Sequence, residues 1–197
     1  MVRIACALFL AALGCATLIA SSVEQVSMAD VTKGSEFIFR GRVLDTRTTR
    51  DGNSPIFTHV TFEVLEVYKG PNAGNRIELD FMGGKIGTLE LKVADMRFPA
   101  PGETGIYFVE SLKRKQVHPL YGWQQGHYVI NRDASGVERV RTARGRAVMS
   151  VAEDGPATTS PSEIIPRGLI TAESVQSGAG LTVADFKRRI QQIQSAR

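Results

Sequence analysis

The stretch IFTHVTFEVLEVYKG, Ile56–Gly70, is the part of the sequence that decides the fold. It is rich in β-branched and aromatic residues, which fit the pleated, half-buried surface of a strand. Val60, Phe62 and Val64 share one face with polar residues between them, which is the period of a half-buried strand. Beyond them the apolar positions move to the opposite face. We therefore expect a β-bulge near Val64–Leu65 that bends a long strand.

Shorter alternating segments occur on both sides of this stretch and predict further strands. They cover residues 37–44, 76–81, 88–93, 105–110, 126–131 and 137–141. Turn residues such as Asp51–Gly52–Asn53 and Asp133–Ala134–Ser135–Gly136 separate them. Strands at short spacing with no helical period between them indicate an antiparallel barrel or sandwich. The sequence therefore predicts a mainly β domain, either a barrel or a sandwich, over residues 30–145.

The last third of the chain changes in composition. Residues 151–180 are rich in Ser, Thr, Pro, Gly and Ala, which predicts a flexible linker. Residues 181–196 predict an amphipathic α-helix capped by Thr182, with Asp185 three residues later as in a capping box. Four apolar side chains share one face of this helix at helical spacing: Val183, Phe186, Ile190 and Ile193. We expect that face to pack on the β domain.

Residues 1–22 have the pattern of a secretory signal peptide. Arg3 precedes an uncharged run, Ile4–Ala20, and small residues follow it. This pattern predicts an exported protein, periplasmic or secreted. Two alternatives remain open. Leu13–Gly14–Cys15 is similar to the end of a lipoprotein box, which would place a lipid on Cys15, and the run just reaches the length of an uncleaved membrane anchor.

Composition makes several classes of function unfavourable. The chain has 24 basic and 20 acidic side chains, a formal net charge of +4. Basic residues gather at 40–50, 113–115, 139–146 and 187–189, which we interpret as a solvated surface rather than a nucleic-acid site. Both cysteines, Cys6 and Cys15, lie in the export segment, so the mature domain has no disulfide framework and no cysteine metal site. We expect contact with a membrane only through the signal segment or a lipid on Cys15.

No motif of the sequence predicts catalysis or a cofactor. The nucleophile elbow and the phosphate-binding loop are both missing. The three histidines do not have the spacing of a metal site: His59, His118 and His127. Carboxylates that alternate along the strands are typical of a solvated face: Glu63, Glu66, Glu78 and Asp80. We therefore assign no catalytic, cofactor or metal residues and expect a protein that is not an enzyme. The alternative is a hydrolase of envelope polymers that uses some of these groups.

The most distinctive segment is YGWQQGHY, residues 121–128, which contains the only tryptophan. Aromatic rings beside amides are typical of a recognition surface for a partner or a carbohydrate. The competing interpretation is that these rings fill the core and that the glycines permit close packing. The candidate ligand or partner surface consists of Tyr121, Trp123, Gln124, Gln125, His127 and Tyr128.

Several of these segments together resemble a known family. FRGRV (39–43) precedes VTFEVLEVYKG (60–70), then FPAPGE (98–103), YFV (107–109) and QGHYV (125–129). This order, over roughly residues 30–140, resembles secreted bacterial proteins of unknown function with an NTR-like domain. The resemblance implies an OB-fold antiparallel barrel, the fold shared with tissue inhibitors of metalloproteinases.

The resemblance does not extend to inhibitor activity. That branch of the fold binds the protease metal through the amine and carbonyl of an N-terminal cysteine. The mature chain has no free cysteine, and a lipid on Cys15 would block its amine. We therefore expect an exported, non-enzymatic binding or accessory β-domain that acts on another envelope or secreted protein.

Overall fold

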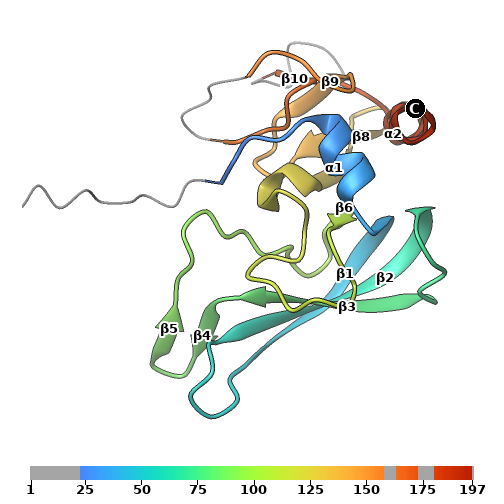
Figure 1. Cartoon of the computed structure of the whole chain (residues 1–197). Coiled ribbons are helices and arrows are strands. Elements are labelled where there is room, and N and C mark those ends of the chain that lie inside the picture. Colours follow the sequence, from blue (N-terminus) through green and yellow to red (C-terminus); the bar gives the residue numbers. More distant parts are fainter. Residues whose placement is uncertain (1–22, 158–162, 173–179, 197) are drawn as a thin grey trace, which may run out of the picture.

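The structure is a computed structural model that describes residues 23–157, 163–172 and 180–196. The predicted signal peptide and the lipidation candidate Cys15 lie outside the described residues. The described chain is mainly β, with a large antiparallel sheet and a C-terminal helix, as the sequence predicts (Figure 1). Its strands are β1 (Phe37–Thr49), β2 (Phe57–Lys69), β3 (Arg76–Met82), β4 (Gly84–Ile86), β5 (Leu89–Leu91), β6 (Thr104–Val109), β7 (His127–Arg132), β8 (Glu138–Thr142), β9 (Ala147–Val151) and β10 (Leu169–Ala172). Its helices are α1 (Met28–Gly34), the 3-10 turn η1 (Trp123–Gly126) and α2 (Val183–Ser195).

Eight strands form one sheet in the order β10-β9-β8-β7-β6-β1-β2-β3. Strands β4 and β5 form a separate hairpin beyond β3. In the described part of the chain β10 and β3 stand at opposite ends of the large sheet and do not pair. Closure into a barrel is therefore not present among these residues, and β3 has one unpaired edge.

The long strands β1 and β2 are bent by irregular pairing. Arg40 pairs with Glu66 and Gly41 with Val64, so Leu65 is left out of the register. This confirms the predicted bulge near Val64–Leu65. The register shifts twice more along the same pair of strands, and each such irregularity bends and twists the ribbon. The two strands therefore sweep away from the helices toward the β4–β5 hairpin (Figure 1).

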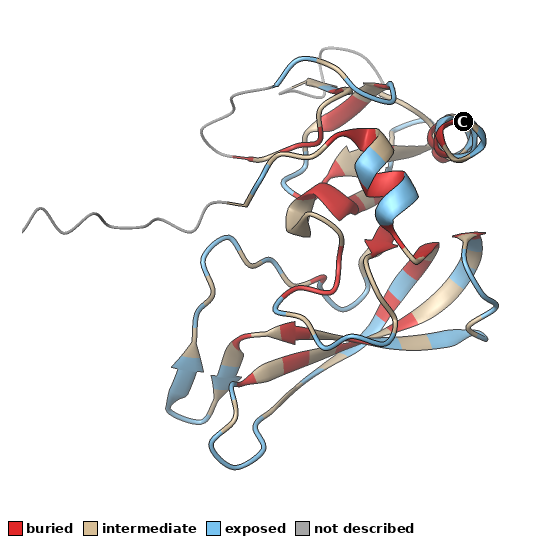
Figure 2. Ribbon diagram, in the orientation of Figure 1, coloured by how far each residue is buried: buried red, intermediate tan, exposed pale blue. Residues whose placement is uncertain are grey.

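Apolar side chains form two clusters on opposite faces of the sheet. One cluster includes Phe37, Phe39, Phe62 and Tyr107, and the other includes Ile38, Ile106 and Phe108 with both α-helices. Consecutive residues at the start of β1 and along β6 alternate between the clusters, so β6 and the first part of β1 are buried on both faces (Figure 2). The predicted inward face of β3, Ile77, Leu79 and Phe81, packs into the first cluster.

Two glycines permit the close packing of aromatic rings in the first cluster. Gly41 on β1 pairs with Gly105 on β6. A Cβ on Gly41 would lie 2.6 Å from the Phe39 ring, and one on Gly105 would lie 2.8 Å from the Tyr107 ring. The absence of side chains at these positions lets both rings lie against the backbone.

The C-terminal helix has the predicted cap and the predicted buried face. The Thr182 side chain accepts a hydrogen bond from the Asp185 backbone N–H, at 3.1 Å. The buried residues of α2 are Val183, Phe186, Ile190 and Ile193. The Phe186 ring lies 4.9 Å from the Tyr128 ring, between centroids. Burial of this apolar face, rather than helix propensity, holds α2 on the sheet.

The N-terminal helix α1 lies beside the C-terminal part of the chain. Ser27 and Asp30 form a complete capping box at its start. The Met28 N–H donates to the Arg167 carbonyl at 2.9 Å, and the Arg167 N–H donates to the Val26 carbonyl at 2.8 Å. These bonds fix the first described residues to a segment about 140 positions away in the sequence.

Parts of the predicted linker are ordered strands. The prediction of a linker over 151–180 is wrong for residues 169–172, which form β10 and pair with β9. Leu169 is 2% exposed and belongs to the cluster beneath α2. The composition of this segment does not indicate a strand, because it contains few aromatic residues. The strand is anchored instead by one buried side chain, that of Leu169. Residues 158–162 and 173–179 of the same range lie outside the described residues.

Candidate functional site

The segment 121–128, the candidate surface of the sequence analysis, is largely interior. Gln125, His127 and Tyr128 are each about 1% exposed, and Trp123, Tyr121 and Gln124 are half-buried. The Gln125 side chain accepts from the Val26 N–H and donates to the Glu24 carbonyl, so it fastens the N-terminal segment. Gln124 donates to the Asp95 carbonyl. The structure therefore does not present these six side chains together on one surface.

The tryptophan stacks on a neutral histidine. The Trp123 and His118 rings lie 5.3 Å apart, between centroids, at an angle of 18°. Burial lowers the pKa of His118 to about 3, so its ring is uncharged at neutral pH. The His118 Nδ1 accepts a hydrogen bond from the Leu120 N–H. Both rings thus belong to the packing of the loop that precedes β7.

His127 belongs to a buried polar group beneath the first cluster. Its Nε2 lies 2.6 Å from Glu103 Oε1, and the Tyr107 hydroxyl donates to the same oxygen at 3.1 Å. Burial raises the pKa of Glu103, but the hydrogen bonds from His127 and Tyr107 and the charge of Arg97 outweigh it and hold the pKa below 4.5. The carboxylate therefore stays charged and joins β6, β7 and the preceding loop.

The open surface of the sheet is the outer edge of β3. In an antiparallel pair, alternate residues exchange both backbone hydrogen bonds with the partner strand, and the residues between them point away. The Gly83 N–H donates to the Ile56 carbonyl, and the Val64 N–H donates to the Asn75 carbonyl. These two bonds mark the hydrogen-bonded pairs at either end of the β2–β3 ladder. Every second residue between them also bonds to β2, and on β3 these residues are Ile77, Leu79 and Phe81.

The residues between them, Arg76, Glu78, Asp80 and Met82, direct their backbone groups outward. Within the described chain, Met82 alone of these four has a backbone partner there: its N–H donates to the Val117 carbonyl at 2.9 Å. Among the described residues, no hydrogen bond involves the backbone groups of Glu78 and Asp80 that point outward. These groups are free to pair with another extended chain.

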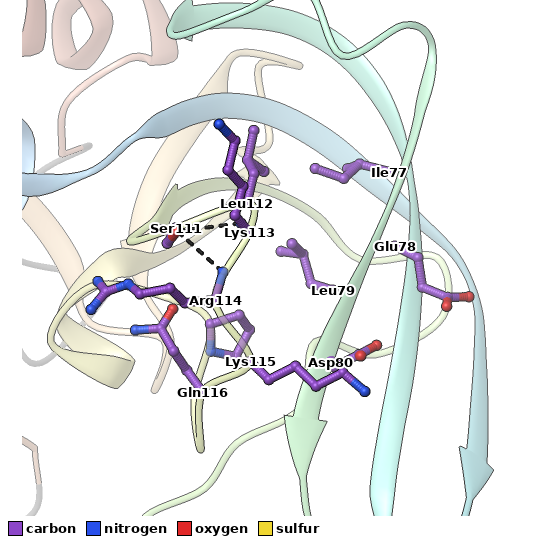
Figure 3. A pocket seen from close by; sticks show the side chains of 11 residues that line it. Ile77, Glu78, Leu79, Asp80, Ser111, Leu112, Lys113, Arg114, Lys115 and Gln116 are labelled. Atoms are coloured by element: carbon purple, nitrogen blue, oxygen red, sulfur yellow. Dashed lines mark hydrogen bonds between the residues drawn. The ribbon is translucent and has the colours of Figure 1, made fainter.

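A groove of about 390 Å³ runs between this edge and the loop formed by residues 111–119. Figure 3 shows Ile77 and Leu79 pointing from β3 toward the loop, while Glu78 points away from it. The loop is held in place from below: the Glu36 carboxylate accepts hydrogen bonds from the Ser111 hydroxyl and the Leu112 N–H. The groove thus has an apolar floor, a free strand edge and a fixed opposite wall.

The opposite wall is basic. Lys113, Arg114 and Lys115 are exposed and line the groove. Arg114 forms an ion pair with Glu110 at 2.8 Å, and no such pair involves Lys113 or Lys115 within the described residues. The Oε1 atom of Gln116, which also lines the groove, is buried without a hydrogen-bond partner. This wall therefore offers a ligand two ammonium groups, those of Lys113 and Lys115.

Most of the groups considered for hydrolysis lie apart from one another. Glu63 pairs with Arg42, Glu66 pairs with Lys187, and Asp80 pairs with His59. His118 and His127 are both buried elsewhere. One combination that the sequence does not show is His59 with Glu78 and Asp80, whose ligand atoms all lie within 4.8 Å of one another. This triad could hold a metal ion. His59 lies about 20 residues before the two carboxylates, and the register of β2 and β3 brings it beside them.

Comparisons with protein-family models, with curated proteins and with solved structures found no match to this chain. In the described part of the chain, none of the helices has both the length and the apolar character needed to cross a membrane.

Proposed function

We propose that this protein is an exported binding domain that holds an extended segment of another exported protein against the free edge of β3. The observation that carries the proposal is the pair of unpaired backbone positions, Glu78 and Asp80, facing a groove. An extended peptide that adds to a sheet edge gains main-chain hydrogen bonds, and the surrounding pockets select its side chains. The signal-like pattern of residues 1–22 supports export.

The chemistry of the groove favours an acidic segment with apolar residues at alternate positions. Side chains of an added strand alternate between the two faces of the sheet. Those on the groove side would lie over Ile77 and Leu79, and carboxylates at the rim would meet Lys113 and Lys115. The groove has a volume of only about 390 Å³, so the contact that it offers a peptide is small. We therefore expect weak, reversible binding rather than a permanent complex.

We also propose that the domain is a variant of the NTR-like, OB-fold architecture. The support is a strongly bent antiparallel sheet with bulged long strands and a helix packed on one face. Inhibition of a metalloprotease is not part of the proposal, because the cysteine that such inhibition requires is missing from the mature chain.

Carbohydrate binding and polymer hydrolysis have weaker support than strand addition. A sugar would need exposed rings, but Tyr128 is about 1% exposed and Trp123 stacks on His118. Hydrolysis would need two of the acidic or imidazole groups in one cleft. Glu63 is paired with Arg42 and His127 with the buried Glu103. The groups that do lie together are His59, Glu78 and Asp80, and His59 does not line the groove.

Site-specific photo-crosslinking in cells that export the protein tests the proposal. A photoreactive amino acid at Lys113 should give a discrete cross-linked product with another exported protein. The same amino acid at Leu65, which is 46% exposed on β2 away from the groove, is the matched control and should not. Equal products from both positions, or none from Lys113, would contradict the proposal.

Backbone variants separate strand addition from ordinary side-chain contact. Glu78→Pro removes an N–H that points outward and leaves the hydrogen bonds to β2 in place. Glu78→Ala removes the same side chain but keeps the N–H. We expect the cross-link at Lys113 to disappear in the proline variant and to persist in the alanine variant. A loss in both variants would instead assign binding to the carboxylate.

A further inference from the structure

His59, Glu78 and Asp80 are brought together by the pairing of β2 with β3. His59 is directly opposite Asp80, and Glu78 is the diagonal neighbour on the same face. The His59 Nδ1 lies 2.7 Å from Asp80 Oδ1 and 3.6 Å from Glu78 Oε1. Two ligands bound about 2.1 Å from a tetrahedral Zn²⁺ are roughly 3.4 Å apart, so the triad is already close to ligand spacing.

A fourth residue orients the imidazole. The Thr49 hydroxyl of β1 lies 2.6 Å from His59 Nε2. Without a metal, the His59 Nδ1–H donates to Asp80 Oδ1, because a carboxylate can only accept. When a metal ion replaces that proton, Nδ1 presents its lone pair to the ion and the Nε2–H donates to the Thr49 hydroxyl. A histidine that ligates a metal usually donates its other ring N–H to such a partner, which fixes both tautomer and ring orientation.

The burial of the three groups also suits a metal site. The His59 side chain is 16% exposed and therefore held in place, whereas those of Asp80 and Glu78 are 38% and 45% exposed. An ion can reach the carboxylates from solvent, and a water molecule can complete the coordination. Three protein ligands plus water is the arrangement of an open zinc site.

We propose that His59, Glu78 and Asp80 form a binding site for a divalent transition metal, with Zn²⁺ as the fitting ion. The imidazole nitrogen selects against Ca²⁺ and Mg²⁺, which prefer oxygen ligands. Other groups face the triad: Arg47 lies 3.5 Å from Glu78, the Thr61 hydroxyl reaches the same carboxylate, and Lys115 extends toward Asp80 from the loop (Figure 3). Arg47 contacts Oε2 of Glu78, whereas Oε1 faces His59, so one oxygen of this carboxylate is directed toward the proposed ion.

The metal site and the proposed strand addition are independent. The metal would use the side chains of Glu78 and Asp80, which lie on the face of the sheet. Strand addition would use their backbone groups, which lie in the plane of the sheet. Glu78→Pro removes a metal ligand as well as an edge N–H, so it does not distinguish the two sites, whereas Thr49→Val touches only the metal site.

Titration calorimetry of the purified, tag-free protein with ZnCl₂ tests the site. We expect one ion per chain for the wild type and no comparable binding of CaCl₂. Replacing a direct ligand should lower the affinity for Zn²⁺ by more than the 10- to 100-fold that is typical of outer-shell partners. Asp80→Asn replaces a direct ligand with the least change of side-chain shape. Thr49→Val should lower the affinity by about 10-fold. Glu63→Gln, a carboxylate of β2 outside the triad, should leave the affinity unchanged.

The result that would overturn the proposal is Zn²⁺ binding that persists unchanged in His59→Ala and Asp80→Asn, since other groups would then hold the ion. Absence of one-to-one binding in the wild type would overturn it as well. A change of the His59 ring resonances on addition of Zn²⁺, followed by NMR, gives a readout that does not depend on affinity. If the His59→Ala chain fails to fold, Asp80→Asn and the ring resonances still decide the question.

Discussion

Removal of the Glu103 carboxylate should destabilise the protein far more than removal of a surface carboxylate. Glu103 accepts hydrogen bonds from His127 and from Tyr107, whose side chains are about 1% exposed or less. Glu103→Ala leaves both groups buried without a partner, at about 1–3 kcal/mol each. We therefore expect a loss of about 4 kcal/mol, a large part of the stability of a typical domain.

The assay is urea unfolding followed by far-UV circular dichroism. With a slope of about 2 kcal/mol per molar urea, the midpoint should fall by about 2 M. Glu110→Ala is the matched control, because it breaks an exposed ion pair with Arg114 and should cost less than about 1 kcal/mol. Glu103→Gln keeps one acceptor and should fall between the two.

A double-mutant cycle of Glu103→Gln with Tyr107→Phe gives the refuting result. If the two side chains are hydrogen-bonded as described, the combined loss differs from the sum of the single losses by about 0.5–3 kcal/mol. Strict additivity, or an equal cost for Glu103→Ala and Glu110→Ala, would show that the buried network does not contribute to stability.

Three further outcomes follow from the packing and the charges. Gly105→Ala places a Cβ 2.5 Å from the Tyr128 carbonyl oxygen, so overpacking should cost about 1–3 kcal/mol and lower the melting temperature. Phe186→Ala should cost about 3–5 kcal/mol by emptying the contact beneath α2, whereas Arg189→Ala on the exposed side of the helix should stay within about 0.5 kcal/mol of the wild type in urea unfolding. The pKa of Glu103 is lower in the folded than in the unfolded state, so the ionised carboxylate stabilises the fold fully at pH values above 4.5, its ordinary pKa. This stabilisation is lost as the pH falls through the pKa of Glu103 in the folded state. The difference in the free energy of unfolding between the wild type and Glu103→Gln should therefore shrink in this acid range.

The periodic parts of the fold could be predicted from the sequence. The inward faces of β2 and β3 and the buried face of α2 follow from side-chain spacing alone. The bulge at Leu65 also follows, because the apolar side chains change face there. Segments without such a period were missed. Helix α1 is only seven residues long, although its start, Ser27 followed by Asp30, carries a capping signal.

The candidate site could not be predicted because it depends on long-range pairing. The aromatic segment 121–128 has the composition of a recognition surface, but Tyr128 is needed to fill the core beneath Phe186. In the sequence, residues 113–115 have the composition of an ordinary solvated surface. Their position opposite an unpaired strand edge results from the order of strands in the sheet, in which β3 is last.

The attachment of the N-terminal residues to Arg167 has a consequence for how the molecule is made. Contacts between residues so far apart in sequence form late, because the chain must close a large loop before they contribute. Helix α1 leaves the ribosome early, but its backbone hydrogen bonds to Glu153 and Arg167 form only after the last quarter of the chain has followed it. A chain that cannot complete its fold during synthesis stays unfolded for longer. An unfolded chain can pass through a narrow export channel, so this delay suits a protein that we propose is exported across a membrane.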